Sequence, residues 1–269
     1  MHGVNDRAVS LRIFVIKTKF NNQINFSFHK MNLDYEKLGF KCGIEIHQEL
    51  NTKKLFCNCS SAMEENNKII EFKRKLRAVE GETGKVDRAA KFEHFRDREF
   101  IYHGYQEEAC LVETDSEPPH PVDKEALDIA LGVSKLLELK VPDTLCVMRK
   151  TVTDGSACSG FQRTILVGIE SDKSYLPKSK VKIDQLNLEE DACKIEKRKG
   201  NKVFYSLSRQ GIPLLEIGTK PQIKNPIHAK KTAKEIGTIL RSFNVKRGLG
   251  TIRQDVNVSI EKGARVEIK

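Results

Sequence analysis

The chain has 269 residues, of which 39% are hydrophobic and 31% are charged, and this composition indicates a globular protein rather than a disordered or fibrous one. It has no run of eighteen apolar residues, so we expect no membrane-spanning helix. The formal net charge of +10 is compatible with an anionic partner such as nucleic acid or nucleotide, but does not establish one.

The first thirty residues differ from the rest of the chain. Their apolar stretch at 11–16 is too short for a secretory signal, although the scarcity of acidic residues leaves an organelle transit peptide as an alternative. Met31 begins a segment that looks like a more natural start. We therefore expect residues 1–30 to be a disordered extension and residues 31–269 to form the folded part.

Residues 43–50 alternate apolar side chains with Glu45, His47 and Glu49, which predicts a half-buried strand. Two carboxylates and an imidazole on one face are costly to bury unless they are paired or bound to a cation. The pattern therefore suggests a functional site at the end of this strand. The alternative, which this segment alone favours, is an edge strand with a solvated polar face.

Seven cysteines are scattered through the chain, and an odd number favours reduced thiols in a cytoplasmic protein over a disulfide framework. Cys57 and Cys59 have the spacing of half a zinc site, but a structural site needs four ligands. The next cysteine, Cys110, stands alone in the sequence. We interpret these thiols as buried or incidental.

The middle of the chain begins with a densely charged region. Residues 64–108, with a basic stripe at 73–77, predict a solvated helix and loops that RNA phosphates could contact. Residues 111–115 predict a strand. Asp123 is expected to cap a core-packing helix that ends before Pro142.

A loop rich in small and hydroxyl residues follows. Arg149 and Lys150 precede it, and Gly155 and Gly160 bound it, with Ser159 inside. Such loops can offer backbone N–H groups and hydroxyls to phosphate oxygens. The sequence is not a Walker motif, and an ordinary Gly/Ser hairpin is the alternative.

A predicted strand at 181–188 ends in Glu189, Glu190 and Asp191. Adjacent carboxylates repel one another unless cations lie between them, so this cluster needs a structural reason. We expect residues 203–207, which follow a Lys-Gly-Asn turn, to form a hairpin with this strand.

Glu216 lies within an otherwise apolar strand at 212–217, so it is either an edge residue or a ligand. Asn225 opens an amphipathic helix that extends to about Phe243.

Two strands complete the chain. The first, at 248–260, carries Arg253, Asp255 and Asn257 on one face. The second, at 265–269, stops without a turn or cap, and we expect the chain to be cut before its natural end.

Several of these segments together resemble one family, the B and E subunits of tRNA-dependent amidotransferases. The matching stretches, in order, are Gly-Ile-Glu-Ile-His at 43–47, Leu-Glu-Glu-Asp-Ala at 188–192, Gly-Ile-Pro-Leu-Leu-Glu-Ile at 211–217 and Arg-x-Asp-x-Asn-Val-Ser at 253–259. Further stretches at 110–121, 147–152 and 159–164 are similar to the archaeal E branch. The resemblance covers roughly residues 31–269.

The resemblance implies an α+β fold, a mixed and largely antiparallel sheet with flanking helices that forms the amino-terminal part of the catalytic domain. It implies ATP-dependent conversion of Glu-tRNA(Gln) to Gln-tRNA(Gln), in which ATP phosphorylates the glutamate carboxylate and ammonia displaces phosphate. An asparaginase-like partner, the D-type amidotransferase chain, would supply the ammonia. E-type chains are much longer than this one, so we expect a fragment.

The resemblance also implies a Mg²⁺ site formed by His47, Glu189 and Glu216. Carboxylate oxygens suit this hard ion, whereas His47 is a less usual ligand that matches the family's metal-binding histidine. Glu45 is expected beside them in a catalytic role, on the metal or next to its ligands. The paired-cysteine zinc site of some bacterial B-type chains lacks its second half here.

The phosphates of ATP would face Arg149, Lys150 and the loop at Ser159 and Gly160, with Arg253 as a further catalytic residue. Two other interpretations remain: a basic RNA-binding module without catalysis, and a B-type amidotransferase chain that also serves Asp-tRNA(Asn).

Overall fold

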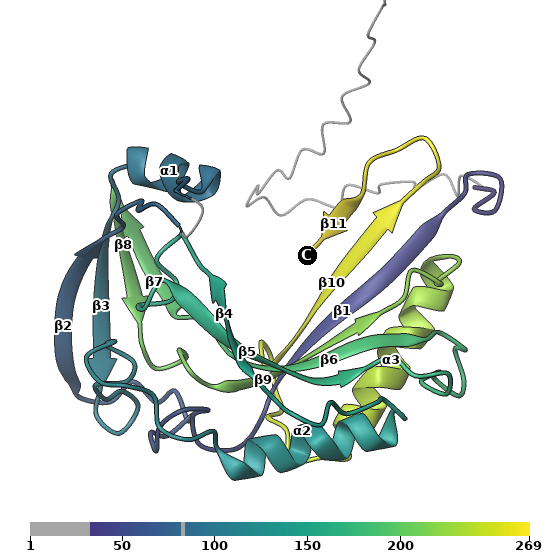
Figure 1. Cartoon of the computed structure of the whole chain (residues 1–269), viewed down its shortest axis with the longest axis horizontal. Coiled ribbons are helices and arrows are strands. Elements are labelled where there is room, and N and C mark those ends of the chain that lie inside the picture. The colour runs from purple at the N-terminus through teal and green to yellow at the C-terminus, as the bar shows by residue number, and fades with distance from the viewer. Residues whose placement is uncertain (1–32, 82–83) are drawn as a thin grey trace, which may run out of the picture. The chain divides into compact units, whose positions relative to one another are not determined.

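The computed structural model describes residues 33–81 and 84–269 (Figure 1), so the predicted extension at 1–30 lies outside the described residues. The helices and strands in the described part of the chain are β1 (Lys41–Glu49), β2 (Lys68–Lys75), α1 (Arg88–Phe95), β3 (Glu99–Tyr105), α2 (Lys124–Leu136), β4 (Val147–Thr151), β5 (Phe161–Ile169), β6 (Ile183–Glu190), β7 (Lys194–Lys199), β8 (Lys202–Ser206), β9 (Pro213–Thr219), α3 (Pro226–Leu240), β10 (Ile252–Ser259) and β11 (Val266–Ile268).

The strands form two sheets. The large sheet has seven strands in the order β11-β10-β1-β9-β6-β5-β4, and every neighbouring pair is antiparallel. The small sheet has four strands in the order β2-β3-β8-β7, of which β3 and β8 run parallel. The predicted α+β fold with a mixed, largely antiparallel arrangement is therefore confirmed.

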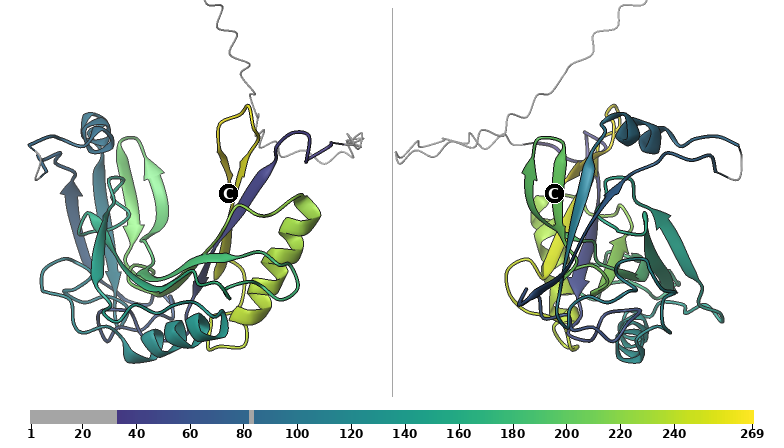
Figure 2. Two further views of the ribbon diagram at one scale, coloured as in Figure 1. Left: turned by 45° about the vertical axis from the view of Figure 1, so that its right-hand side comes forward. Right: turned by 90° about the vertical axis from the view of Figure 1, so that its left-hand side faces the viewer.

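The large sheet has one apolar face, and α2 and α3 lie along it (Figure 1, Figure 2). Its side chains include Ile44, Ile46, Leu188, Leu215 and Ile217, all of which are at most 2% exposed. Removing each such side chain from water stabilises the fold by roughly 1.5–3 kcal/mol. Because side chains alternate along a strand, the residues between them point to the opposite face.

Both predicted helices of this layer are confirmed, and each begins at a side-chain cap. The Asp123 carboxylate accepts the Ala126 N–H at 2.8 Å at the start of α2. At the start of α3, the Asn225 side chain accepts a hydrogen bond from the His228 N–H at 2.8 Å. Pro226 follows at the first helical position, where its lack of an N–H leaves no donor unsatisfied.

The prediction of a solvated helix and loops for residues 64–108 is wrong for most of that region. β2 and β3 form half of the small sheet, and only the short α1 is helical. Phe100 and Tyr102 of β3 are buried against Val203 and Tyr205 of β8. Lys73 and Lys75 of β2 alternate with Phe72 and are exposed, whereas Arg74 lies on the Phe72 side and donates to the carbonyls of Thr114 and Cys158.

Two further local predictions are corrected. Residues 111–115 form turns rather than a strand, with the Thr114 N–H donating to the Cys110 carbonyl. Residues 203–207 pair with β7 in the small sheet rather than with the strand that ends at Glu190. The turn between β7 and β8 places Gly200 at a φ of 60°, which a glycine adopts without strain.

The two strands with polar residues are not at an edge. β1 lies between β10 and β9, and β9 lies between β1 and β6. The edge alternative is therefore wrong both for residues 43–50 and for Glu216, and their polar side chains need compensation within the fold. Among the described residues, no helix has the length and apolar character needed to cross a membrane.

Candidate active site

The polar face of the large sheet gathers the predicted site residues by strand register. His47 lies directly opposite Glu216 on one side and opposite Arg253 on the other. Glu216 in turn lies opposite Asn187 of β6. Directly opposed residues share a face, so four strands contribute to one row of polar side chains.

The centre of this row is a group of three donors. One ligand atom each from Glu45, His47 and Glu216 lies within 4.8 Å of the other two. His47 Nε2 is 3.2 Å from Glu216 Oε2 and 3.5 Å from Glu45 Oε1. Asn187 Nδ2 donates to the other Glu216 oxygen at 2.9 Å. Two carboxylates and one imidazole thus face a common point, which is an arrangement that can hold a divalent cation.

The two carboxylates of this group, Glu45 and Glu216, are close enough to repel each other, and this affects their pKa values. Burial raises the pKa of Glu45, and the Glu216 charge raises it further. Burial also disfavours the charged form of Glu216, but hydrogen bonds from His47 and Asn187 outweigh it and lower its pKa to about 2. Burial lowers the pKa of His47, but the hydrogen bond and charge of Glu216 outweigh this and raise it. A bound cation would relieve the repulsion between the two carboxylates.

Glu189 lies beside this group without being part of it. Lys150 Nζ is 3.3 Å from Glu189 Oε2, and Thr164 Oγ1 donates to the same oxygen at 3.2 Å. Burial raises the pKa of Glu189, followed by the Glu216 charge. The structure thus brings the predicted trio of His47, Glu189 and Glu216 to one face. Among the described residues, however, Glu45 rather than Glu189 completes the compact donor group.

The three consecutive acids at 189–191 each meet a separate cation, which explains how adjacent carboxylates coexist. The pairs are Glu189 with Lys150 at 3.3 Å, Glu190 with Arg163 at 3.0 Å, and Asp191 with Arg253 at 2.9 Å. Alternation along the chain sends Glu190 to the opposite side from Glu189, so the repelling charges are separated as well as neutralised.

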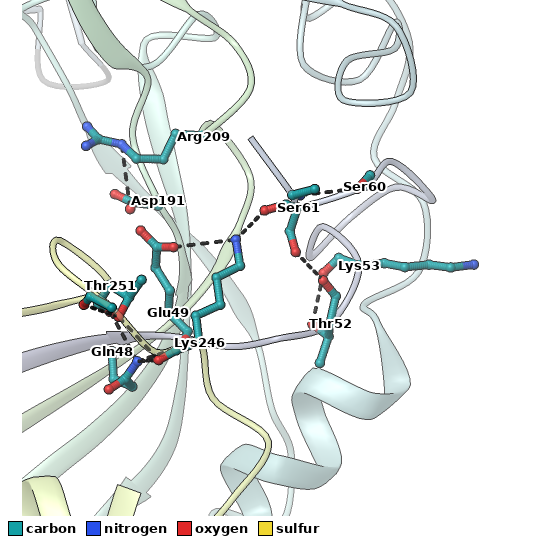
Figure 3. A network of polar contacts seen from close by, with 12 residues as sticks. Gln48, Glu49, Thr52, Lys53, Ser60, Ser61, Asp191, Arg209, Lys246 and Thr251 are labelled. Atoms are coloured by element: carbon teal, nitrogen blue, oxygen red, sulfur yellow. Dashed lines mark hydrogen bonds and ion pairs between the residues drawn. The ribbon is translucent and has the colours of Figure 1, made fainter. Parts of the chain in front are cut away.

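Arg253 is held firmly at the edge of this site. Its Nη2 donates to both carboxylate oxygens of Asp191 at 2.9 Å, and Arg209 Nε lies 3.7 Å from the same carboxylate. Close by, Lys246 Nζ is 3.5 Å from Glu49 Oε2 (Figure 3). Asp191 is 3% exposed, so its two arginine partners supply the charge compensation that a buried carboxylate requires.

Polar contacts around Lys246 also join two connecting segments of the chain (Figure 3). The Lys246 ammonium also donates to the Ser61 carbonyl, and the Ser61 hydroxyl donates to the Thr52 carbonyl at 2.6 Å. Gln48 Nε2 donates to the carbonyls of Lys246 and Thr251 at 3.0 and 3.1 Å. The connection after β1 is thereby fastened to the connection before β10.

A cavity of about 680 Å³ opens over the polar face. This volume is within the range of small-molecule sites. Its charged and polar lining residues are Glu45, His47, Lys150, Gln162, Glu189, Asp191, Glu216, Arg253, Gln254, Asp255, Glu267 and Lys269.

Not all predicted phosphate-binding residues are at this cavity. Arg149 points away from Lys150, and its guanidinium lies over the Phe161 ring at 5.3 Å. Ser159 lines a separate cavity of about 90 Å³ and donates its hydroxyl to the Phe161 carbonyl at 2.9 Å. Gly160 ends the loop with a φ of 79°. Within the described chain, the lining of the cavity over the polar face includes Lys150 but not Arg149, Ser159 or Gly160.

Gln162, Thr164, Asn187 and Gln254 were not singled out from the sequence, and Asp191 was not recognised as the partner of Arg253. Asn187 lies two positions before Glu189, and Gln162 lies two before Thr164. Because strand side chains alternate, extending the period of two from each chosen residue would have found Asn187. The role of Asp191 could not be predicted in this way, because it depends on which arginine packs against it in the folded chain.

The sequence of this chain was compared with known protein families and proteins. Residues 40–269 match the model of the GatB/GatE catalytic domain. The E chain of a glutamyl-tRNA(Gln) amidotransferase from Methanococcus maripaludis (strain C5) is 51% identical over 243 residues, and that from Methanocaldococcus jannaschii is also 51% identical over 243 residues. The one from Methanothermobacter thermautotrophicus is 49% identical over 238 residues.

These matches cover 88–89% of this chain but only 38% of each relative. The family match includes every strand of the large sheet from Phe40 onward, and with it all the residues of the polar face. The chain therefore belongs to the GatB/GatE catalytic domain family.

Proposed function

We propose that this chain carries the site at which a tRNA-dependent amidotransferase converts Glu-tRNA(Gln) to Gln-tRNA(Gln). The observation that carries the proposal is the Glu45–His47–Glu216 donor group, which lies in a cavity also lined by Lys150 and Arg253. The names of the relatives support the substrate, since each is described as the E chain of a glutamyl-tRNA(Gln) amidotransferase.

The reaction has two bond exchanges. The γ-phosphoryl group of ATP passes to a carboxylate oxygen of the tRNA-bound glutamate, and ADP leaves. The nitrogen of ammonia then bonds to the carbonyl carbon, the carbon–oxygen bond to phosphate breaks, and the nitrogen loses a proton. The first exchange brings several anions together, so the site must supply positive charge and fix their positions.

Glu45, His47 and Glu216 would hold a Mg²⁺ ion, because their donor atoms converge and two of them are carboxylates. When bound, this ion neutralises charge that develops on the phosphoryl oxygens. Glu189, which is 3.3 Å from Lys150, would position the Lys150 ammonium toward the phosphates. Arg253, fixed by Asp191, would offer its remaining N–H groups to the same anions.

The ammonia would come from a separate chain of the asparaginase-like D type. The relatives' designation as subunits supports an enzyme of several chains. A basic chain of net charge +10 also suits a partner as anionic as tRNA.

The test compares Glu216→Gln with Glu170→Gln, since Glu170 pairs with Lys182 and Lys220 on the surface. The assay mixes the chain and its ammonia-supplying partner with ATP, Mg²⁺, ammonium chloride and Glu-tRNA(Gln). We expect Glu216→Gln to lower Glu-tRNA-dependent phosphate release by at least about 100-fold with little change in tRNA affinity. The Glu170→Gln control should match the wild type.

Binding of Glu-tRNA(Gln) by the wild type without any ATP turnover would contradict the proposal and favour the RNA-binding module. The same assay with Asp-tRNA(Asn) separates an enzyme restricted to Glu-tRNA(Gln) from a B-type amidotransferase.

A further inference from the structure

Positive charge gathers at one end of the small sheet, in a part of the fold that does not line the cavity over the polar face. We refer to residues 73–81, 84–99 and 194–202 as the basic end. These residues include fourteen Lys and Arg but six Asp and Glu, a difference of 14 − 6 = +8. A local excess of this size favours an anionic partner.

Much of this charge is not neutralised within the fold. The nearby carboxylates are already paired with other cations: Lys75–Asp97 at 2.7 Å, Arg96–Glu93 at 2.8 Å and Lys202–Glu99 at 3.2 Å. Six exposed cations take part in no ion pair with the described residues, namely Arg77, Arg88, Lys91, Lys197, Arg198 and Lys199. These six are available to the phosphates or carboxylates of a partner.

Helix α1 lies at the basic end, directly before β3 (Figure 1), and none of its residues is buried. It carries two aromatic side chains, Phe92 and Phe95, which are 62% and 74% exposed. Because they are three positions apart, the two rings are neighbours on the helix surface. Apolar rings that a fold leaves in water and surrounds with charge indicate an interaction surface.

A cation lies over each of these rings. Lys91 Nζ is 6.0 Å from the centre of the Phe95 ring, and the Arg96 guanidinium is 5.6 Å from the centre of the Phe92 ring. Exposed rings interleaved with cations are typical of surfaces that bind single-stranded nucleic acid, where bases stack on the rings and phosphates meet the cations. A duplex has no free base faces to offer, so the rings favour unpaired nucleotides.

The basic end is connected to the candidate active site through β7. The turn after β7 is fixed to the end of α1, because Asn201 Nδ2 donates to the Asp97 carbonyl at 3.0 Å. At its other end, β7 begins three residues after Asp191, which lines the cavity over the polar face. Eight residue steps separate Asp191 from Lys199, so at about 3.3 Å per residue they are at most about 26 Å apart. A few unpaired nucleotides can extend over such a distance.

We propose that the basic end binds unpaired nucleotides of RNA, with bases stacked on Phe92 and Phe95 and phosphates held by the cations of α1 and β7. The identity of this RNA as the tRNA substrate, bound near its aminoacylated end, rests on the proposed function. The surface itself is tested by binding alone, without ATP or turnover.

Fluorescence anisotropy of a labelled, unstructured oligonucleotide of adenosine and cytidine measures binding to the whole chain. We expect Phe92→Ala and Phe95→Ala each to weaken binding by about tenfold, and Phe92→Tyr, which keeps a ring, to stay within about twofold of the wild type. Both rings are exposed, so these variants should fold. Tyr175→Ala is the matched control, because Lys182 lies over that exposed ring at 5.6 Å outside the basic end.

Salt dependence separates the cations from the rings. Arg88→Gln and Lys199→Gln should each reduce the slope of log affinity against log salt concentration by about 0.7, the value for one phosphate contact on a single strand. The two Phe→Ala variants should lower the affinity without changing this slope, because stacking releases no counterions.

RNA affinity that is equal in the wild type and in a Phe92→Ala/Phe95→Ala double variant would overturn the proposal. An equal loss in Tyr175→Ala, or a wild type that binds no RNA at low salt, would do the same. Unchanged RNA affinity combined with ring-dependent binding to phosphatidylserine vesicles would assign the surface to a membrane instead. Ring-dependent RNA binding by a chain without ATP turnover would contradict the proposed function and support this surface.

Discussion

His47 and Glu216 are direct cross-strand partners on β1 and β9, with Nε2 and Oε2 3.2 Å apart. Both strands are interior strands of the large sheet, so neither residue lies on an edge strand. Asn187 from the next strand occupies the other Glu216 oxygen, which leaves the Glu45 side of the group to accept a cation.

The first prediction concerns cation binding by the chain alone. Glu216→Gln removes one of two carboxylates from the donor group and should weaken Mn²⁺ binding, as a Mg²⁺ substitute, by about tenfold or more. Electron paramagnetic resonance titration of free Mn²⁺ measures this. Glu170→Gln, a surface carboxylate, is the matched control and should bind as the wild type does. Equal affinities in all three proteins would contradict the assignment of the ion to this group.

A second prediction separates neighbouring basic residues. Lys150 lines the cavity beside Glu189, whereas Arg149 lies over the Phe161 ring on the other side of β4. Lys150→Ala should therefore lower ATP affinity by about tenfold, which corresponds to one charge-assisted contact of roughly 1.4 kcal/mol, and Arg149→Ala should change it by less than about twofold. Binding of a fluorescent ATP analogue provides the measurement. A larger loss of ATP affinity in Arg149→Ala than in Lys150→Ala would show that the phosphates bind on the Arg149 side of β4.

A third prediction concerns the two glycines that bound the loop between β4 and β5. Both have positive φ, 82° at Gly155 and 79° at Gly160. A Cβ at Gly155 would lie 2.6 Å from the Phe100 ring, whereas one at Gly160 would meet nothing within 4 Å. Gly160→Ala should cost about 1 kcal/mol of backbone strain. Gly155→Ala should cost about 3 kcal/mol, because overpacking adds to the strain.

Urea unfolding of both alanine variants measures the difference in the free energy of unfolding. Equal losses would mean that Phe100 moves aside without cost and that the loop is not packed against the small sheet as described.

A fourth prediction concerns pH and Glu65. Burial disfavours its charge, but hydrogen bonds from Lys194, Ser206 and Ser208 outweigh this and lower the pKa of Glu65. A carboxyl with a lowered folded-state pKa stabilises the fold above its unfolded pKa of about 4.3, and this stabilisation is lost as the pH falls through the folded value. Glu65→Gln should therefore cost about 1 kcal/mol at pH 7.

The cost of Glu65→Gln should shrink at pH 3, because this pH lies below the unfolded-state pKa and part of the stabilisation by the lowered folded-state pKa is lost there. Paired urea unfolding curves at pH 7 and pH 3 measure it. A penalty that is the same at both pH values would show that the ion pair with Lys194, at 2.9 Å, contributes nothing through charge.

Local patterns determined part of the structure. The caps at Asp123 and Asn225 predicted both helices of the large layer, because a cap and an apolar stripe are encoded within a few residues. The alternation around His47 likewise predicted a strand with one polar face, which β1 confirms. The region at 64–108 failed because its strands become amphipathic partners only when β8, about a hundred residues later, pairs with β3.

By itself the sequence determined the family, the polar strands and most of the side chains at the candidate site. Only the tertiary structure decided which of them meet: Glu45 rather than Glu189 in the compact donor group, Asp191 against Arg253, and Cys110 beside Cys57. The physical reason is that pairing across strands depends on register, and proximity across loops depends on packing, and both are set by residues far apart in the chain.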